Sequence, residues 1–105
     1  MLHRVIILKR AKLQFQNTCN YLDSEFGTRI GDHFIDETER CIARLVRYPE
    51  SGHLEPISDK EVYRSKIIGE YTKMYYTVHG NTLYVAAFVD MRMSPDNIKE
   101  AVSGQ

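Results

Sequence analysis

The sequence has no tryptophan, only two cysteines and no net charge, since its fourteen basic residues are matched by fourteen acidic ones. Zero net charge argues against binding to nucleic acid through bulk positive charge, so any such contact would need a local basic patch. The longest uninterrupted apolar run, Val85 to Val89, is far shorter than the roughly 20 residues of a membrane span. Internal repeats and low-complexity segments are also missing. These absences leave an ordinary globular chain.

The N-terminus lacks the features of a secretion signal. Lys9 and Arg10 end the short apolar stretch that reaches Leu8, and no small-residue cleavage site follows. We therefore expect the protein to stay in the cytoplasm and to have no membrane partner. Its 105 residues suffice for one domain that folds without metal ions or disulfides. We expect that domain to cover residues 1–105, with 96–105 as a short C-terminal tail or helix.

The two cysteines, Cys19 and Cys41, are predicted to be free. They lie eight residues before and fourteen residues after Gly27, where the helix pattern described below reverses direction. The offset of six residues corresponds to roughly 9 Å along antiparallel helices, whereas a disulfide needs Cα atoms closer than about 7 Å. Both are predicted to be buried as small apolar side chains.

The first half of the chain predicts a strand and a helical hairpin. Residues 3–8 are mostly apolar and β-branched, which favours a strand. From Lys9 the apolar period changes to that of a helix, which Gly27 ends and after which Thr28 can cap a second helix over 28–48. Both helices carry an apolar stripe that should pack against a sheet. The stripe residues are Ala11, Phe15, Cys19, Leu22 and Phe26, then Ile30, Phe34, Cys41 and Leu45, flanked by Ile35, Ile42 and Val46.

The second half predicts a loop over 49–60, with Leu54 and Ile57 as inward anchors, followed by strands over 61–68, 71–79 and 82–90. Gly80-Asn81 suits a two-residue hairpin turn. That turn sets a register in which His79 pairs with Thr82, Val78 with Leu83, Tyr76 with Val85 and Met74 with Ala87. These residues and Val89 should face the helices. Ser94-Pro95 then predicts the start of a helix. The expected fold is α+β, with the hairpin on one face of an antiparallel sheet.

The opposite face of the sheet is predicted to be aromatic and cationic rather than simply polar. Aromatic side chains beside arginine and lysine are typical of protein interfaces and of surfaces that stack RNA bases. Lys66 shares one face of its strand with Arg64, although the sequence leaves open which face. The alternative is cross-strand aromatic packing that the tail partly covers. The candidate binding residues are Lys66, Tyr71, Tyr75, Tyr84 and Phe88, next to Lys73, Thr77, Ala86 and Asp90.

Several short motifs, in this order and spacing, resemble the RelE/ParE family of toxins from bacterial type II toxin–antitoxin systems. They are Tyr63-Arg64, then Gly69-Glu70-Tyr71 leading to Tyr75-Tyr76-Thr77-Val78, and the segment Asp90-Met91-Arg92-Met93-Ser94-Pro95. The resemblance extends over most of the chain. It implies an N-terminal strand, a two-helix hairpin and a three-stranded antiparallel meander, with helices on one face. It also implies a cognate antitoxin as partner, in a possible hetero-oligomer.

Family members differ in their target. Some cleave mRNA in the ribosomal A site, whereas others bind and poison DNA gyrase. If this chain were a ribonuclease, the resemblance would make Arg64, Lys73 and Arg92 its catalytic residues, with Lys66 beside the phosphate. Lys73 stands where many relatives have arginine, so the bidentate fork for phosphate is lost. No tyrosine or histidine follows Tyr84, although cleaving members often use one late in the chain. These differences favour a ParE-like toxin that binds gyrase over an mRNA interferase, with an inactive interaction module as a third hypothesis.

The remaining polar residues have simpler interpretations. Asp90 and Arg92 could form a salt bridge that closes the last strand instead of acting on a substrate. The histidines lack the spacing of metal ligands, and His79 is expected to be exposed beside the Gly80 turn. We therefore expect neither a metal nor a cofactor. The histidines considered are His3, His33, His53 and His79.

Overall fold

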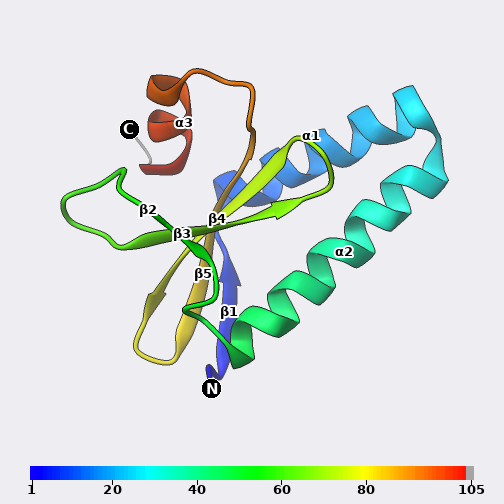
Figure 1. Ribbon diagram of the computed structural model, residues 1–105. Coiled ribbons are helices and arrows are strands. Elements are labelled where there is room, and N and C mark those ends of the chain that lie inside the picture. Colours follow the sequence, from blue (N-terminus) through cyan, green and yellow to red (C-terminus); the bar gives the residue numbers. More distant parts are fainter. Residues whose placement is uncertain (104–105) are drawn as a thin grey trace.

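The computed structural model describes residues 1–103 and contains five strands and three helices (Figure 1). Residues 104 and 105, the end of the tail predicted over 96–105, lie outside the described residues. The helix predicted from Ser94-Pro95 is confirmed as α3. The elements are β1 (Arg4–Ile7), α1 (Lys9–Phe26), α2 (Thr28–Arg47), β2 (His53–Glu55), β3 (Tyr63–Ile68), β4 (Thr72–His79), β5 (Thr82–Asp90) and α3 (Pro95–Ser103).

The strands form one sheet in the order β1-β5-β4-β3-β2. The meander β3-β4-β5 is antiparallel as predicted. The expectation of a wholly antiparallel sheet is wrong, because β1 runs parallel to β5, with Arg4 beside Thr82 and Ile7 beside Val85. The prediction of an unpaired loop over 49–60 is also wrong, since β2 lies within it and pairs with β3. These backbone hydrogen bonds come from segments distant in sequence, which local patterns do not predict.

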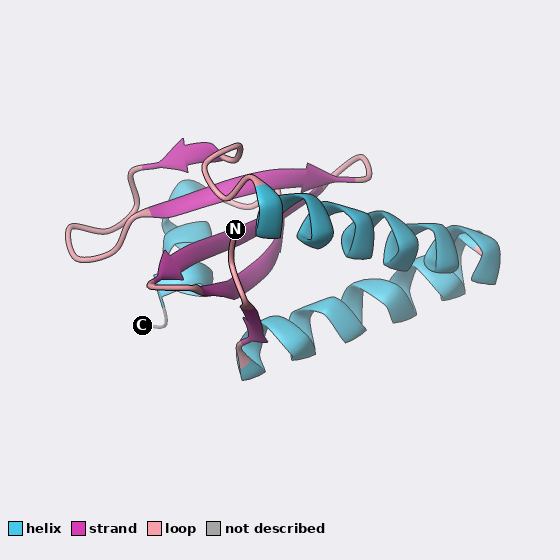
Figure 2. Ribbon diagram, turned by 90° about the horizontal axis from the view of Figure 1, so that it is seen from below, coloured by secondary structure: helices cyan, strands magenta, loops and turns pink. Residues whose placement is uncertain are grey.

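The helical hairpin covers one face of the sheet and α3 packs on the other, and the strands pass between them in the two views (Figures 1 and 2). We call these the hairpin face and the α3 face. Arg10 on α1 helps to hold α3, because its Nη1 donates to the carbonyl oxygens of Glu100 and Ala101, each at 3.1 Å. The hairpin-face core is formed chiefly by Ala11, Phe34, Cys41, Leu45, Met74, Tyr76, Leu83, Val85 and Phe88, with Phe15, Cys19 and Leu22 packed against it.

The predicted register holds near the turn and fails further along β5. His79 pairs with Thr82 and Tyr76 with Val85, as expected. The register then shifts, because Tyr75 pairs with Ala87 and leaves Ala86 as an extra residue, a β-bulge. One extra residue reverses the alternation of faces. Met74 therefore pairs with Phe88 and not with Ala87.

The bulge exchanges the predicted faces of the β5 residues that follow it. Phe88 was predicted to lie on the outer face, but it is 4% exposed and belongs to the hairpin-face core, with its ring 5.1 Å from that of Phe15. Ala87 and Val89 were predicted to face the hairpin and instead lie on the α3 face.

Other local predictions have mixed outcomes. Cys19 and Cys41 are free, as predicted. Thr28 does not cap α2: Gly27, with φ of 93°, both ends α1 and precedes α2, and no side chain caps that end. Ile57 packs on the α3 face, whereas Leu54 is 54% exposed on the short edge strand β2. Within residues 1–103, no helix is both long and apolar enough to cross a membrane.

Candidate functional site

Arg64 lies on β3 opposite Tyr76 and therefore on the hairpin face. Its Nη1 donates to the carbonyl oxygens of Gly52 (3.1 Å) and Glu50 (3.3 Å) in the loop after α2. The Tyr76 hydroxyl fixes the same loop, since it donates to the carbonyl of Pro49 at 2.6 Å and accepts from the amide of Gly52 at 3.0 Å. A Cβ on Gly52 would come within 2.3 Å of that hydroxyl, so only glycine fits. Arg64 thus has a structural role in this loop.

Lys73 lies on the other side of the sheet, opposite Ile67 and beside the buried Tyr75. Its Nζ is 2.7 Å from Glu55 Oε2, and the Ser65 hydroxyl donates to the same oxygen at 2.6 Å. The hydrogen bond to Glu55 is the main reason that the pKa of Lys73 is raised. Burial alone would raise the pKa of Glu55, but the hydrogen bonds from Lys73 and Ser65 outweigh it and lower that pKa. The charge of Lys73 is therefore neutralised within the chain.

Arg92 follows β5 and forms the salt bridge with Asp90 that the sequence allowed. Nε and Nη2 of Arg92 lie 2.9 Å and 2.6 Å from the two carboxylate oxygens, and the Arg92 amide donates to Oδ1 at 2.8 Å. Its guanidinium also lies over the Tyr71 ring, 4.1 Å from the centroid. The hydrogen bonds from Arg92 lower the pKa of Asp90 to about 2. Both groups remain charged across the physiological range.

The structure does not bring these three cations together. Arg64 and Lys73 lie on opposite faces of the sheet. Arg92 lies near the end of β5 where Asp90 pairs with Thr72, four residues along β4 from the partner of Arg64. That is roughly 13 Å at about 3.3 Å per residue. General acid–base cleavage of RNA needs its proton donors and cations around one phosphate, and this arrangement does not supply them.

The aromatic surface predicted on the outer face is mostly covered. Tyr75 is only 2% exposed, because α3 packs over it through Val102 and Ile98. Packing beneath the tail, the alternative interpretation, is therefore correct for this residue. Of the candidate binding residues, Tyr71 is 49% exposed and Tyr84 and Lys66 are half-buried, while Phe88 is in the core. Lys66 pairs with Met74 and so shares the hairpin face with Arg64.

An apolar groove of about 750 Å³ lies between the hairpin tip and the β3–β4 turn. Phe34, Leu22 and Ile68 contribute to its walls. Phe26 and Ile30 were predicted to be core residues but are 61% and 43% exposed in this groove. Their stripes continue to the hairpin tip, which extends beyond the strands (Figures 1 and 2). The sequence carried a signal for the groove. These two apolar residues lie next to the Gly27 turn, at the ends of the two helices, and not in the middle of either helix.

The rim of the groove carries charge. Glu37, Glu70 and Asp90 lie along it with Arg92, which the Asp90 carboxylate already neutralises. The carboxylate of Glu37 accepts a hydrogen bond from the Gly69 amide at 3.1 Å, which ties the β3–β4 turn to α2. The uncompensated charge on the rim is therefore negative. An apolar segment with basic residues beside it would complement this groove in shape and charge.

The histidines and cysteines form no obvious centre of chemistry. His79 is exposed, as predicted, with its Nε2 2.8 Å from Glu61 Oε1 and its ring edge-on to Tyr84. Burial is the main reason that the pKa values of Cys19 and Cys41 are raised, which disfavours the reactive thiolate. Within residues 1–103, no group of three or more His, Cys, Asp and Glu side chains could hold a metal ion.

Comparison with known proteins supports the fold. No protein-family model matches the sequence, and no curated protein matches it. A solved structure described as the chromosomal ParDE TA system from P. aeruginosa contains a chain with a similar fold. The TM-score is 0.70 and the sequence identity is 10%, over 87% of this chain and 98% of that chain. The fold expected from the resemblance to the RelE/ParE family is thus confirmed.

Proposed function

We propose that this protein is the toxin of a type II toxin–antitoxin pair, that it acts by binding DNA gyrase rather than by cleaving RNA, and that a cognate antitoxin neutralises it. The observation that carries the proposal is the separation of Arg64, Lys73 and Arg92. Each is held by partners within the chain, and the two faces of the sheet separate Arg64 from Lys73. The fold shared with a chain of a ParDE system supports the toxin assignment.

The groove at the hairpin tip is the proposed docking site of the antitoxin. Its wall includes Phe26, Ile30 and Tyr71, which are large side chains left 43–61% exposed. Burial of such side chains is a main source of affinity at protein interfaces. The negative rim favours an antitoxin segment whose apolar side chains are flanked by lysine or arginine. Tyr84, which pairs with Thr77 near the β4–β5 turn, is not part of this groove.

The target is tested by three measurements on the intact protein. Induced expression without antitoxin should arrest growth, purified protein should inhibit supercoiling by gyrase, and ribosomes programmed with mRNA should show no codon-positioned cuts. Rapid cuts that Lys73→Met abolishes would overturn the proposal in favour of an mRNA interferase. Inactivity in all three assays would instead identify an inactive interaction module.

The docking site is tested by calorimetry with the cognate antitoxin. Phe26→Ala should weaken binding by roughly five- to thirtyfold, because the exposed part of such a ring contributes about 1–2 kcal/mol when buried. The matched control is Leu13→Ala, which truncates a side chain that is 58% exposed on the same helix outside the groove. Equal affinities for the two variants would remove the groove from the antitoxin interface.

A further inference from the structure

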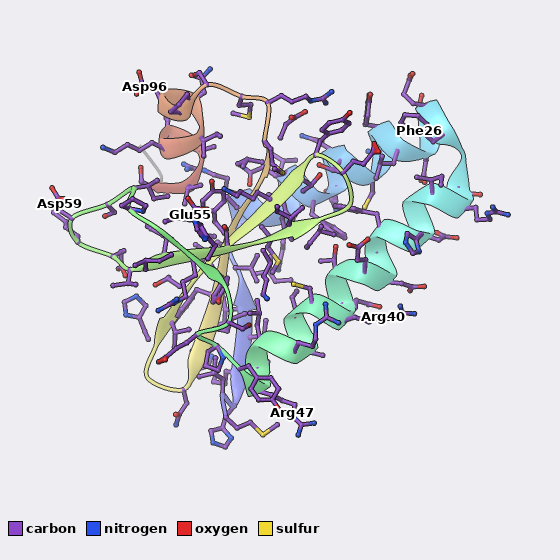
Figure 3. All side chains as sticks on the ribbon, viewed as in Figure 1. Phe26, Arg40, Arg47, Glu55, Asp59 and Asp96 are labelled. Atoms are coloured by element: carbon purple, nitrogen blue, oxygen red, sulfur yellow. The ribbon has the colours of Figure 1, made fainter. Side chains whose placement is uncertain are left out.

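The C-terminal half of α2 carries three arginines, Arg40, Arg44 and Arg47, which we call the arginine stripe. Their spacing of four and three residues places them within an arc of about 60° on the helix surface. All three are exposed, and Figure 3 shows Arg40 and Arg47 projecting from the side of α2 away from the strands. Among residues 1–103, no carboxylate lies within salt-bridge distance of any of the three.

Strand β3 extends this positive surface. Arg64 and Lys66 lie on the hairpin face, where β3 packs beside α2. Lys66 and Arg44 both lie close enough to Cys41 that their charges oppose the rise in its pKa caused by burial. The hydrogen bonds of Arg64 go to neutral carbonyl groups, so its charge is not neutralised. Arg44 of the stripe and Lys66 of β3 are thus both near Cys41, which connects the helix cations to the strand cations.

The zero net charge of the chain conceals this surface because the charges are separated along α2. Residues 40–47 contain no acidic side chain, whereas the preceding part of the helix has four, Asp32, Asp36, Glu37 and Glu39. Cations near a helix C-terminus also interact favourably with the helix dipole. That effect accounts for Arg44 and Arg47 in the last turn, but not for Arg64 and Lys66 on the strand.

We propose that the arginine stripe, together with Arg64 and Lys66, binds the phosphate backbone of duplex DNA. Guanidinium groups bind phosphate oxygens bidentately, and successive stripe residues rise by only about 4.5–6 Å along a straight helix. The exposed non-arginine residue between Arg40 and Arg47 is Ala43, which is small, whereas protein interfaces bury large apolar and aromatic side chains at their centre. Among residues 1–103, the stripe makes one cation–π contact, between Arg47 and Tyr48, whereas binding of single strands relies on several stacking aromatic side chains. DNA binding goes beyond the proposed function, since it requires neither antitoxin nor gyrase.

The test is fluorescence anisotropy of a short labelled duplex titrated with purified protein at several salt concentrations. The variant Arg40→Gln/Arg44→Gln/Arg47→Gln should bind at least tenfold more weakly than wild type. Its plot of log K against log salt should be shallower by about 2.7, as expected for the loss of three phosphate contacts. The matched control, Lys12→Gln/Lys60→Gln/Lys99→Gln, makes the same change in net charge at three exposed sites elsewhere and should bind within about threefold of wild type.

Three results would overturn the proposal. These are equal weakening by the two triple variants, tighter binding of single-stranded RNA of the same length, and no binding of duplex by wild type at low salt. Glutamine preserves the helix propensity of arginine, and circular dichroism should show that the variants fold. If the stripe variant does not fold, Arg47→Gln/Lys66→Gln replaces it. The expected slope is then shallower by about 1.8.

Discussion

Replacing Glu55 with glutamine would remove the negative charge beside Lys73 and leave the size of the side chain nearly unchanged. The pair has a nitrogen–oxygen distance of 2.7 Å, and the side chains of Lys73 and Glu55 are 24% and 12% exposed. Hydrogen bonds to charged groups contribute about 1.5–3 kcal/mol, and partial exposure reduces this through solvent screening. We therefore expect Glu55→Gln to lower the free energy of unfolding by about 1–2 kcal/mol. The corresponding decrease in Tm is roughly 5–15 °C.

The loss of stability caused by Glu55→Gln should depend on pH. The pKa of Glu55 is lower in the folded protein than its ordinary value of 4.5. The pair therefore stabilises the fold above that value, and its contribution is lost as pH falls through the folded pKa. Urea unfolding followed by circular dichroism should show the largest difference between wild type and Glu55→Gln at pH 7. The difference should shrink as the pH falls below 4.5, the ordinary pKa value of a glutamate.

A double-mutant cycle with Lys73→Met isolates the interaction between the two side chains. A coupling energy of about 1–2 kcal/mol would agree with the structure. A coupling below about 0.3 kcal/mol, or a stability difference that does not change with pH, would refute the claim that Glu55 neutralises Lys73. Lys73 would then be a free cation, and one argument against the nuclease hypothesis would be lost.

Three further predictions concern other parts of the fold. Tyr76→Phe should destabilise the protein by about 2–3 kcal/mol in urea unfolding, because the lost hydroxyl leaves two backbone groups of the 49–52 loop without partners. The control is Tyr63→Phe, which changes another buried tyrosine of a strand and should destabilise the protein by under about 0.5 kcal/mol. The carboxyl of Asp90 should titrate near 2 by NMR, and Arg92→Gln should move its pKa toward 3.8. Deletion of Ala86 should leave a folded protein, because a β5 strand without the bulge keeps its side chains on the faces observed here. An unfolded product would contradict the assigned bulge.

The helices and the hairpin turn were predictable because their signals are local. The apolar period of α1 and α2 and the glycine between them need only neighbouring residues. The Gly80-Asn81 turn likewise fixes the first pairs of β4 with β5. The bulge was not predictable, because alanine at position 86 gives none of the glycine signal that marks many bulges. Because Ala86 is unpaired, Phe88 lies in the core and not on the surface where it was predicted.

The sequence selected candidate site residues but did not predict their arrangement in space. The sequence identified Arg64, Lys73 and Arg92, and it offered the Asp90 salt bridge as an alternative. It did not reveal that Glu55 would face Lys73, because Glu55 lies in a segment without a strand pattern and becomes part of β2 only by pairing with β3. Ion pairs between distant segments depend on tertiary structure, whereas Asp90 and Arg92 are separated by a single residue in the sequence.

Two of the three positions that the resemblance selects as catalytic, Lys73 and Arg92, have their charge neutralised within the chain. Lys73 and Arg92 each have a carboxylate partner within 2.7 Å, and Arg64 fixes a loop. The stripe arginines of α2 have no such partner among residues 1–103. A phosphate group approaching Lys73 or Arg92 must displace an existing ion pair, while one approaching the stripe displaces only water and counterions. Because that cost is absent on α2, anionic partners should bind there in preference to Lys73 and Arg92.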